Sequence, residues 1–259
     1  MTKLKLNITC NFIGLLKSIP LKNINDLKSK GPIIFKIYLP DYYNIVNELS
    51  LFLNEQETNR ANRYYKEKDK NRFIICRTLL KFVLSNYTEI DTKQIKLNYN
   101  AYKKPYLSSH PSLFFNVSHY GLIAISNSSV GIDVEYIEEK NDLINSLNHI
   151  YNDEEITFIE NAFDKKKAFY SLWTRKEAFV KAIGKGIDEN FSKIPSINGS
   201  HILNASLINN TKNWNIHGFK IEGDYLAAVA YEIEKSNIEK ISIFSLPCTI
   251  KALKNIIQK

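Results

Sequence analysis

The sequence predicts an α+β fold built from two similar halves, and two observations lead to this prediction. Short runs rich in β-branched and aromatic residues, such as 130–135, alternate with longer stretches of helical periodicity, such as 169–183. The order of strand, polar helix start and long helix also occurs twice, which indicates a divergent internal duplication. We therefore expect two fused subdomains, residues 1–129 and 130–259, each with a small antiparallel sheet and packed helices.

Composition narrows the class of protein. With 259 residues, of which 44% are hydrophobic, the chain can bury an ample core. Its three cysteines are far apart and lack metal-ligand spacing, so we expect a reducing, cytoplasmic location. Asparagines interrupt the apolar stretch 4–16, which argues against a signal peptide, and no apolar run approaches the roughly 18 residues of a membrane span.

The formal net charge of +8 predicts anionic partners. The basic residues are scattered, and no zinc-finger or helix-turn-helix pattern supports nucleic-acid binding. A polyanionic cofactor and an acidic protein partner explain the sign of the charge equally well.

The first half begins with a predicted strand at 32–39, followed by helical periodicity over 53–85 in two pieces. Asn54 and Glu57 are spaced as a capping box, and Asp69 is a predicted break before the second helix. Arginine's planar fork matches phosphate oxygens, although an arginine on a helix is most often ordinary surface. Four arginines accompany these helices: Arg60, Arg63, Arg72 and Arg77.

An irregular stretch follows the helices. Pro105 favours an extended chain and leaves the neighbouring Lys104 free to reach a ligand. His119 ends a predicted strand over 113–119, where a buried core histidine and a ligand-binding histidine are both possible. The runs 122–126 and 130–135 are predicted to form an antiparallel pair.

Two carboxylates lie on one face of the strand 130–135. Because side chains alternate along a strand, Asp133 and Glu135 point one way and Ile132 and Val134 point into the core. Such a pair is most often a hydrated strand face. It also matches the needs of Mg²⁺, which prefers carboxylate oxygens and takes further ligands from substrate phosphates.

The helix around 169–183 has one apolar stripe and one polar face. With about 3.6 residues per turn, Glu177 and Lys181 lie one turn apart. A solvated ion pair is the ordinary interpretation, but Glu177 could also add a third carboxylate to those of the strand. The stripe consists of Ala168, Leu172, Phe179 and Ile183, and Gly184 and Gly186 are predicted to end the helix.

The rest of the chain alternates like antiparallel strands. Predicted strands are 191–197, 202–208, 214–221, 225–231 and an edge strand at 241–244, with turns at Asn209-Asn210 and Gly223-Asp224 and a terminal helix over 249–258. Aligning the two halves places Lys81 opposite Glu177 and Ser85 opposite Lys181. Only the second half would then keep the polar pair, which predicts a single active site between the halves.

Two motifs together resemble a known family. Gly131-Ile-Asp-Val-Glu135 followed by Trp173-Thr-Arg-Lys-Glu-Ala-Phe-Val-Lys181 is similar to the defining motifs of the 4′-phosphopantetheinyl transferases, of the larger single-chain type that activates surfactin and other peptide synthetases. Lys104-Pro-Tyr-Leu and Phe115-Asn-Val-Ser-His119 match further elements of that family. Lys103 departs from the pattern, because it stands where the family usually has glycine.

The resemblance implies a reaction and a set of roles. The chain would transfer 4′-phosphopantetheine from coenzyme A to a serine of an apo acyl or peptidyl carrier protein, leaving adenosine 3′,5′-bisphosphate. The fatty-acid, polyketide or peptide pathway of the carrier stays open. By this resemblance, the ligands of Mg²⁺, or of Mn²⁺, would be Asp133, Glu135 and Glu177, and the catalytic residues would be Glu177 and Lys181. Arg60 and Arg72 would contact the 3′-phosphate of coenzyme A. Further contacts with coenzyme A would come from Lys104, Pro105, Ser118 and His119.

We also expect a monomer, because the duplication supplies the interface between the halves within one chain. Two other functions remain compatible with the sequence. Another Mg²⁺-dependent phosphotransferase or hydrolase would use the same carboxylates but would not need a carrier protein to consume coenzyme A. A basic nucleic-acid-binding protein would lose affinity steeply with salt and would be indifferent to Glu177→Gln.

Overall fold

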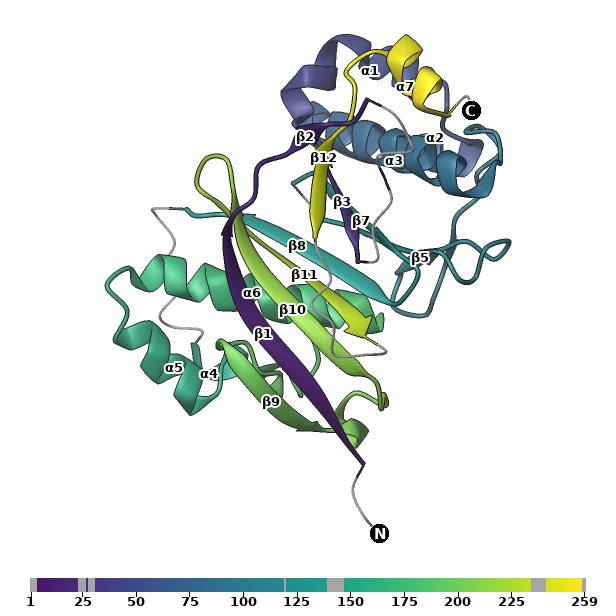
Figure 1. Cartoon of the computed structure of the whole chain (residues 1–259). Coiled ribbons are helices and arrows are strands. Elements are labelled where there is room, and N and C mark those ends of the chain that lie inside the picture. The colour runs from purple at the N-terminus through teal and green to yellow at the C-terminus, as the bar shows by residue number, and fades with distance from the viewer. Residues whose placement is uncertain are drawn as a thin grey trace.

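The computed structural model of the chain describes residues 4–22, 27, 31–118, 120–138, 147–233 and 241–257. Two five-stranded sheets pack against each other, and helices cover the outer face of each sheet (Figure 1). The predicted α+β class is thus confirmed, as four layers in the order helix, sheet, sheet, helix. Between the sheets lies an aliphatic core that includes Ile34 and Ala124 from one sheet and Ile132 and Val229 from the other.

The helices fall into two groups. The first group comprises α1 (Val46–Ser50), α2 (Glu55–Ala61), α3 (Glu67–Thr88) and α7 (Ile250–Ile257). The second group comprises α4 (Leu147–Ile150), α5 (Asp153–Glu160) and α6 (Lys165–Ile183). Short 3₁₀ turns occupy Leu39–Ile45, Phe191–Lys193 and Ala205–Leu207. Among the described residues, no helix is long and apolar enough to cross a bilayer.

One sheet contains, in spatial order, β8 (Val130–Tyr136), β11 (Tyr225–Ile233), β10 (Asn213–Ile221), β1 (Lys5–Leu15) and β9 (Gly199–Asn204). The other contains β2 (Ile19–Pro20), β12 (Ser242–Ser245), β3 (Ile33–Lys36), β7 (Leu122–Ser126) and β6 (Phe114–Val117). A small hairpin joins β4 (Asn98–Tyr99) to β5 (Pro105–Tyr106).

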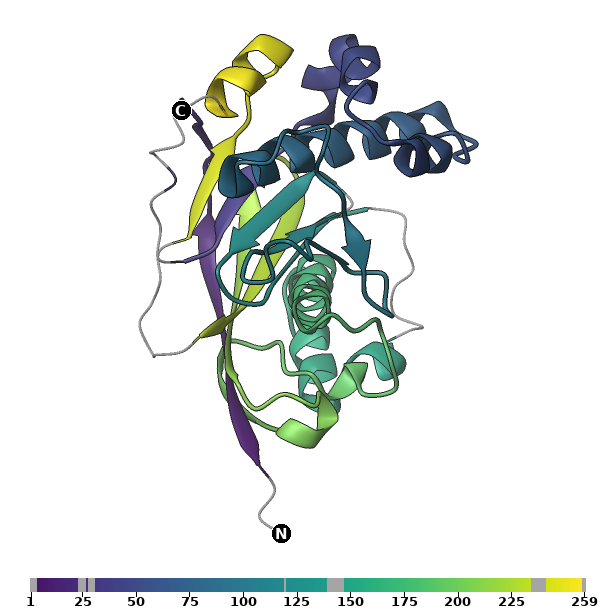
Figure 2. The same cartoon turned by 90° about the vertical axis from the view of Figure 1, so that its right-hand side faces the viewer.

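The two ends of the chain cross the boundary predicted at residues 129 and 130. Strand β1 pairs in parallel with β10 of the second half, and β12 pairs in parallel with β3 of the first half. Figures 1 and 2 show β1 running along the second-half sheet toward β2, while α7 lies with the first-half helices. The sheets are therefore mixed, where the sequence predicted antiparallel sheets, because each terminus adds a strand to the other half.

The internal repeat is visible in the topology. Strands β3, β7 and β6 have the same neighbour order and antiparallel pairing as β8, β11 and β10. Each half also has a capping box, predicted at Asn54 and Glu57 and present there and again at Asn152 and Glu155.

Each half buries a lysine against the glutamate of its capping box. Lys81 Nζ lies 3.2 Å from Glu57 Oε2, and Lys176 Nζ lies 2.8 Å from Glu155 Oε2. A buried ammonium requires such a partner. Because each lysine pairs with the capping-box glutamate of its own half, Lys81 is the counterpart of Lys176. The alignment that placed Lys81 opposite Glu177 was therefore wrong.

Several predicted elements differ in detail. Strands β7 and β8 do not pair with each other, because the chain passes from one sheet to the other at residues 127–129. The predicted strand 191–197 is a turn whose carbonyl oxygens at Phe191, Ser192 and Ile194 accept hydrogen bonds from Lys176. Asp69 lies within the first turn of α3, and the predicted strand 202–208 is β9 followed by a 3₁₀ turn.

Candidate active site

Strand β8 and helix α6 are packed backbone to backbone. A Cβ atom at Gly131 would overlap the carbonyl oxygen of Ala178 and the backbone nitrogen of Ala182. Only glycine allows this approach. It brings the polar residues of the two motifs together, and α6 ends as predicted at Gly184, whose φ is +72°. The other predicted helix end, Gly186, does not have a positive φ.

The free edge of β8 is covered by side chains of the first half. Asn116 Oδ1 accepts a hydrogen bond from the Ile132 N–H at 2.9 Å, and Lys104 Nζ donates to the Val130 carbonyl at 3.0 Å. Lys104 also donates to the Ala182 carbonyl at 2.9 Å. Burial lowers the pKa of Lys104 to about 8. Lys104 is thus not a free side chain in this structure, because it ties β8 to the end of α6.

Lys181 lies at the centre of the second-half site. Its Nζ is 2.6 Å from Asp133 Oδ1 and 3.6 Å from Glu177 Oε2. Burial alone would lower the pKa of Lys181, but Asp133 and Glu177 raise it above its ordinary value. Burial also raises the pKa of Glu177, against the effect of Lys181. The predicted i,i+4 pair is thus a partly buried triad with Asp133.

Glu135 is the second carboxylate on the same face of β8. Burial, and then the charge of Asp133, raises the pKa of Glu135 to about 7, although Lys181 opposes the shift. Asp133 is only 2% exposed, and its Oδ2 accepts no hydrogen bond from any described residue. The single charge of Lys181 therefore offsets only part of the negative charge of these two carboxylates, and Asp133 Oδ2 keeps no partner in the described chain.

Whether these residues suit a divalent cation follows from their chemistry. In the described part of the chain, no three histidine, cysteine, aspartate or glutamate side chains converge closely enough to surround a metal ion. Mg²⁺ however is commonly held by one or two carboxylates, with waters and substrate phosphates as its other ligands. The unpartnered oxygen of Asp133 and the raised pKa of Glu135 fit this two-carboxylate mode.

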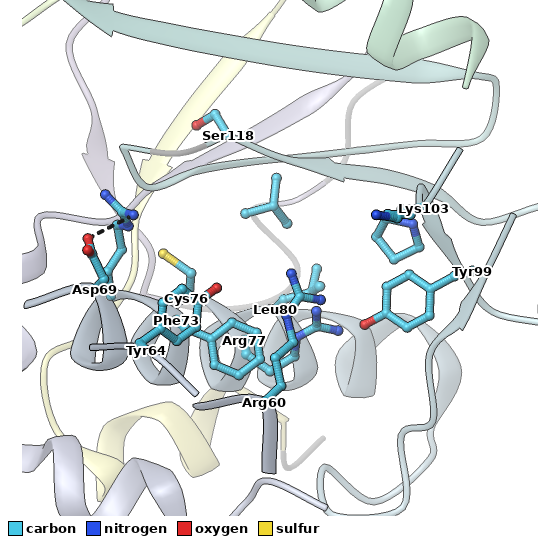
Figure 3. A pocket seen from close by; sticks show the side chains of 13 residues that line it. Arg60, Tyr64, Asp69, Phe73, Cys76, Arg77, Leu80, Tyr99, Lys103 and Ser118 are labelled. Carbon is cyan, nitrogen blue, oxygen red and sulfur yellow. Dashed lines mark ion pairs between the residues drawn. The ribbon is translucent and has the colours of Figure 1, made fainter. Parts of the chain in front are cut away.

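A basic pocket lies in the first half, between α2, α3 and the β4–β5 hairpin (Figure 3). It has a volume of about 250 Å³ and continues into a second hollow of about 650 Å³. Its lining includes Arg60, Arg72, Arg77, Tyr99, Lys103 and Ser118. The charge of the pocket suits an anionic ligand.

The pocket contains four of the six predicted coenzyme A contacts. Arg60, Arg72, Pro105 and Ser118 line it, whereas Lys104 does not. Arg72 is paired with Asp69 at 3.0 Å, and Ser118 Oγ accepts a hydrogen bond from the Leu122 N–H at 2.9 Å. His119 lies outside the described residues.

Tyr120 lies on the side of β8 and β11: its ring centre is 5.9 Å from that of Tyr225, which is 5.1 Å from that of Tyr136. Burial, followed by the charges of Glu135 and Glu138, raises the pKa of Tyr120, while Arg72 opposes the shift. Charges of both regions thus act on the Tyr120 hydroxyl.

Sequence reasoning missed Arg77, Tyr99 and Lys103 as residues of the pocket. Phe73 and Arg77 are one helical turn apart, and this spacing was the available signal. Lys103 has φ = +63°, in the turn where its N–H donates to the Asn100 carbonyl at 3.0 Å. A positive φ is easiest for glycine, which explains why the family usually has glycine at this position. Lys103 adopts the same left-handed backbone although it has a side chain.

Comparisons with known proteins cover most of the chain. Residues 129–230 match a family model described as the 4′-phosphopantetheinyl transferase superfamily, and residues 41–130 match one described as 4′-phosphopantetheinyl transferase, N-terminal. A putative 4′-phosphopantetheinyl transferase of Synechocystis sp. is 28% identical over 222 residues, which are 78% of this chain and 90% of that protein.

Two further relatives have the same description. The 4′-phosphopantetheinyl transferase HetI of Nostoc sp. is 31% identical over 163 residues, which are 60% of this chain and 69% of HetI. The 4′-phosphopantetheinyl transferase Sfp of Bacillus subtilis is 26% identical over 141 residues, which are 52% of this chain and 62% of Sfp.

Proposed function

Because the chain belongs to the 4′-phosphopantetheinyl transferase superfamily, we propose that it takes the phosphopantetheine group from coenzyme A and attaches it to a serine of an apo acyl or peptidyl carrier protein. The products are the holo carrier protein and adenosine 3′,5′-bisphosphate. The observation that best supports this reaction is the Lys181 ammonium between Asp133 and Glu177, and a basic pocket in the first half suits the nucleotide end of the cofactor.

Asp133 and Glu135, with Glu177 beside them, would hold Mg²⁺ or Mn²⁺. Bound there, the cation supplies positive charge that stabilises the pyrophosphate as negative charge develops on its leaving oxygen. The partnerless Oδ2 of Asp133 and the raised pKa of Glu135 support these two residues as the principal ligands.

Glu177 is the proposed base. A serine hydroxyl is a weak nucleophile at neutral pH, so its proton must pass to a nearby group. The raised pKa of Glu177 suits a carboxylate that takes this proton, directly or through a water. The serine oxygen bonds to the phosphorus that carries the pantetheine arm, and the bond from that phosphorus to the bridging oxygen breaks. The electron pair leaves with the adenosine 3′,5′-bisphosphate.

Lys181 contributes a permanent positive charge. Its raised pKa keeps the ammonium protonated at neutral pH, and its contact with Asp133 orients it. The charge would favour departure of the bisphosphate.

The nucleotide end of coenzyme A would occupy the basic pocket. Arg60 and Arg72 would contact the 3′-phosphate, and Ser118 with Pro105 and His119 would complete the binding surface, as the family resemblance implies. The resemblance also implies that Lys104 contacts coenzyme A. In this structure Lys104 has a structural role as well, because its hydrogen bonds to two carbonyl groups hold β8 against α6. These groups supply binding energy that positions the cofactor. Three free cysteines and a cofactor of central metabolism agree with a cytoplasmic location.

The decisive experiment is transfer to apo carrier proteins, followed by intact-protein mass spectrometry. The protein should modify a carrier only when coenzyme A and Mg²⁺ are present. Consumption of coenzyme A without a carrier would instead favour another phosphotransferase or a hydrolase.

Asp133→Asn tests the site with little change in shape. We expect a loss of at least about a hundredfold in transfer rate, because loss of a metal carboxylate removes several kcal/mol of charge stabilisation. Urea unfolding should stay close to wild type. Glu189→Gln, an exposed carboxylate in the loop after α6, is the matched control. Normal turnover by Asp133→Asn would exclude the metal assignment.

A further inference from the structure

We propose that Arg77 and Lys103 are two further phosphate ligands of the basic pocket, and that they determine its selectivity for a ligand with a terminal phosphomonoester. The inference rests on the proposed function, since the ligand considered is coenzyme A, whose ribose carries a 3′-phosphate. Neither residue belongs to the contacts that the family resemblance implies.

Arg77 is a buried cation with an unused donor. Its side chain is 9% exposed, and its Nη1 has no hydrogen-bond partner in the described part of the chain. Glu57 pairs with Arg77 only at 3.7 Å, from Oε1 to Nη1, which is beyond hydrogen-bond distance, and its single negative charge is shared with Lys81, which contacts Oε2. An unsatisfied buried donor is costly, and a phosphate oxygen would remove that cost.

A second arginine next to Arg77 increases the excess of positive charge in this part of the pocket. The guanidinium of Arg60 lies 5.1 Å from the centre of the Phe73 ring, and that of Arg77 lies 5.4 Å from the same ring. Figure 3 shows the two arginines next to each other, with Tyr99 and Lys103 to one side and Asp69 at the opposite end of the pocket. Asp69 pairs with Arg72 at 3.0 Å. Two adjacent guanidinium groups repel unless an anion lies between them.

Lys103 keeps a side chain where the backbone disfavours one. Its φ of +63° lies in the left-handed region, which a residue with a Cβ adopts less readily than glycine. Lys103 lines both hollows of the pocket and adds a fourth cation to Arg60, Arg72 and Arg77. A strained residue at a ligand site suggests that its side chain has a function that offsets the strain.

The test compares two ligands on the full chain by isothermal titration calorimetry. The wild type should bind coenzyme A more tightly than 3′-dephospho-coenzyme A. Arg77→Gln and Lys103→Gln should each weaken binding of coenzyme A about tenfold or more and leave binding of the dephospho compound nearly unchanged. Lys68→Gln is the matched control, because it removes the same charge from an exposed position of α3 outside the pocket.

Lys103→Gly separates the ligand role from a structural role. This variant should raise the melting temperature, because it relieves the left-handed strain, and should still weaken binding of coenzyme A. A purely structural lysine would not move these two readouts in opposite directions.

An unchanged ratio of the two dissociation constants in both Lys103 variants and in Arg77→Gln would overturn the proposal. If Arg77→Gln fails to fold, Arg77→Lys is used in its place. Because it keeps the positive charge, this variant should retain part of the preference for coenzyme A over the dephospho compound. Carrier modification by the wild type is scored separately. Normal transfer with an unchanged ratio refutes only the two ligands, whereas a wild type that binds neither compound refutes the proposed function as well.

Discussion

Replacing His217 by glutamine should remove a pH-dependent loss of stability of about 2 kcal/mol between about pH 7.5 and about pH 5. His217 is 4% exposed on β10, and its Nε2 lies 3.2 Å from the Tyr231 hydroxyl, which also accepts from Asn215 Nδ2 at 3.4 Å. Burial, and then the positive charge of Arg175 on α6, lowers the pKa of His217 to about 4.

The size and sign of the effect follow from proton binding. An unfolded histidine has a pKa of about 6.5. Between about pH 4 and about pH 6.5 the unfolded chain therefore binds a proton that the folded chain excludes. Lowering the pH through this window stabilises the unfolded state, so the free energy of unfolding falls, by about 2 kcal/mol on reaching pH 5.

The assay is urea unfolding of wild type and His217→Gln at both pH values. Glu135, whose raised pKa acts in the opposite direction, contributes equally to both proteins and cancels in the comparison. The expected result is that the wild type loses about 2 kcal/mol more than the variant between the two pH values. An equal loss in both proteins would refute the argument, because it would show that His217 titrates normally in the folded state.

Three further results are expected. Gly131→Ala should destabilise the fold by about 1–3 kcal/mol or more, measured by urea unfolding, because its Cβ would overlap the backbone of α6; wild-type stability would refute the close packing of β8 on α6. Light scattering should give a monomer, because the interface between the repeats lies within one chain, and a stable trimer would contradict this. Raising salt at saturating Mg²⁺ should raise the KM for carrier protein more than the KM for coenzyme A, since steering by the +8 charge acts through solvent and is screened beyond about 8–10 Å. Equal salt sensitivity for both substrates would show that the basic surface does not guide the carrier.

The sequence alone was sufficient wherever the causes are local. A capping box depends on residues three positions apart, so Asn54 and Glu57 were recognisable before any fold was known. Alternation along β8 and the helical repeat of α6 likewise predicted that Asp133 and Glu135 share a face, and that Glu177 and Lys181 lie one turn apart. The motifs then indicated the family.

Long-range pairing decided the rest. The sheet that β1 joins depends on β10, some two hundred residues away, and no local pattern records such a partner. The resemblance implied the same coenzyme A role for Lys104 and Arg72, but only the structure shows that Lys104 also binds two carbonyls and that Arg72 also pairs with Asp69. Arg77 was indistinguishable from its neighbours until the structure buried it without a hydrogen bond for Nη1. The availability of a charged side chain depends on what surrounds its last atoms, and only the folded chain determines those surroundings.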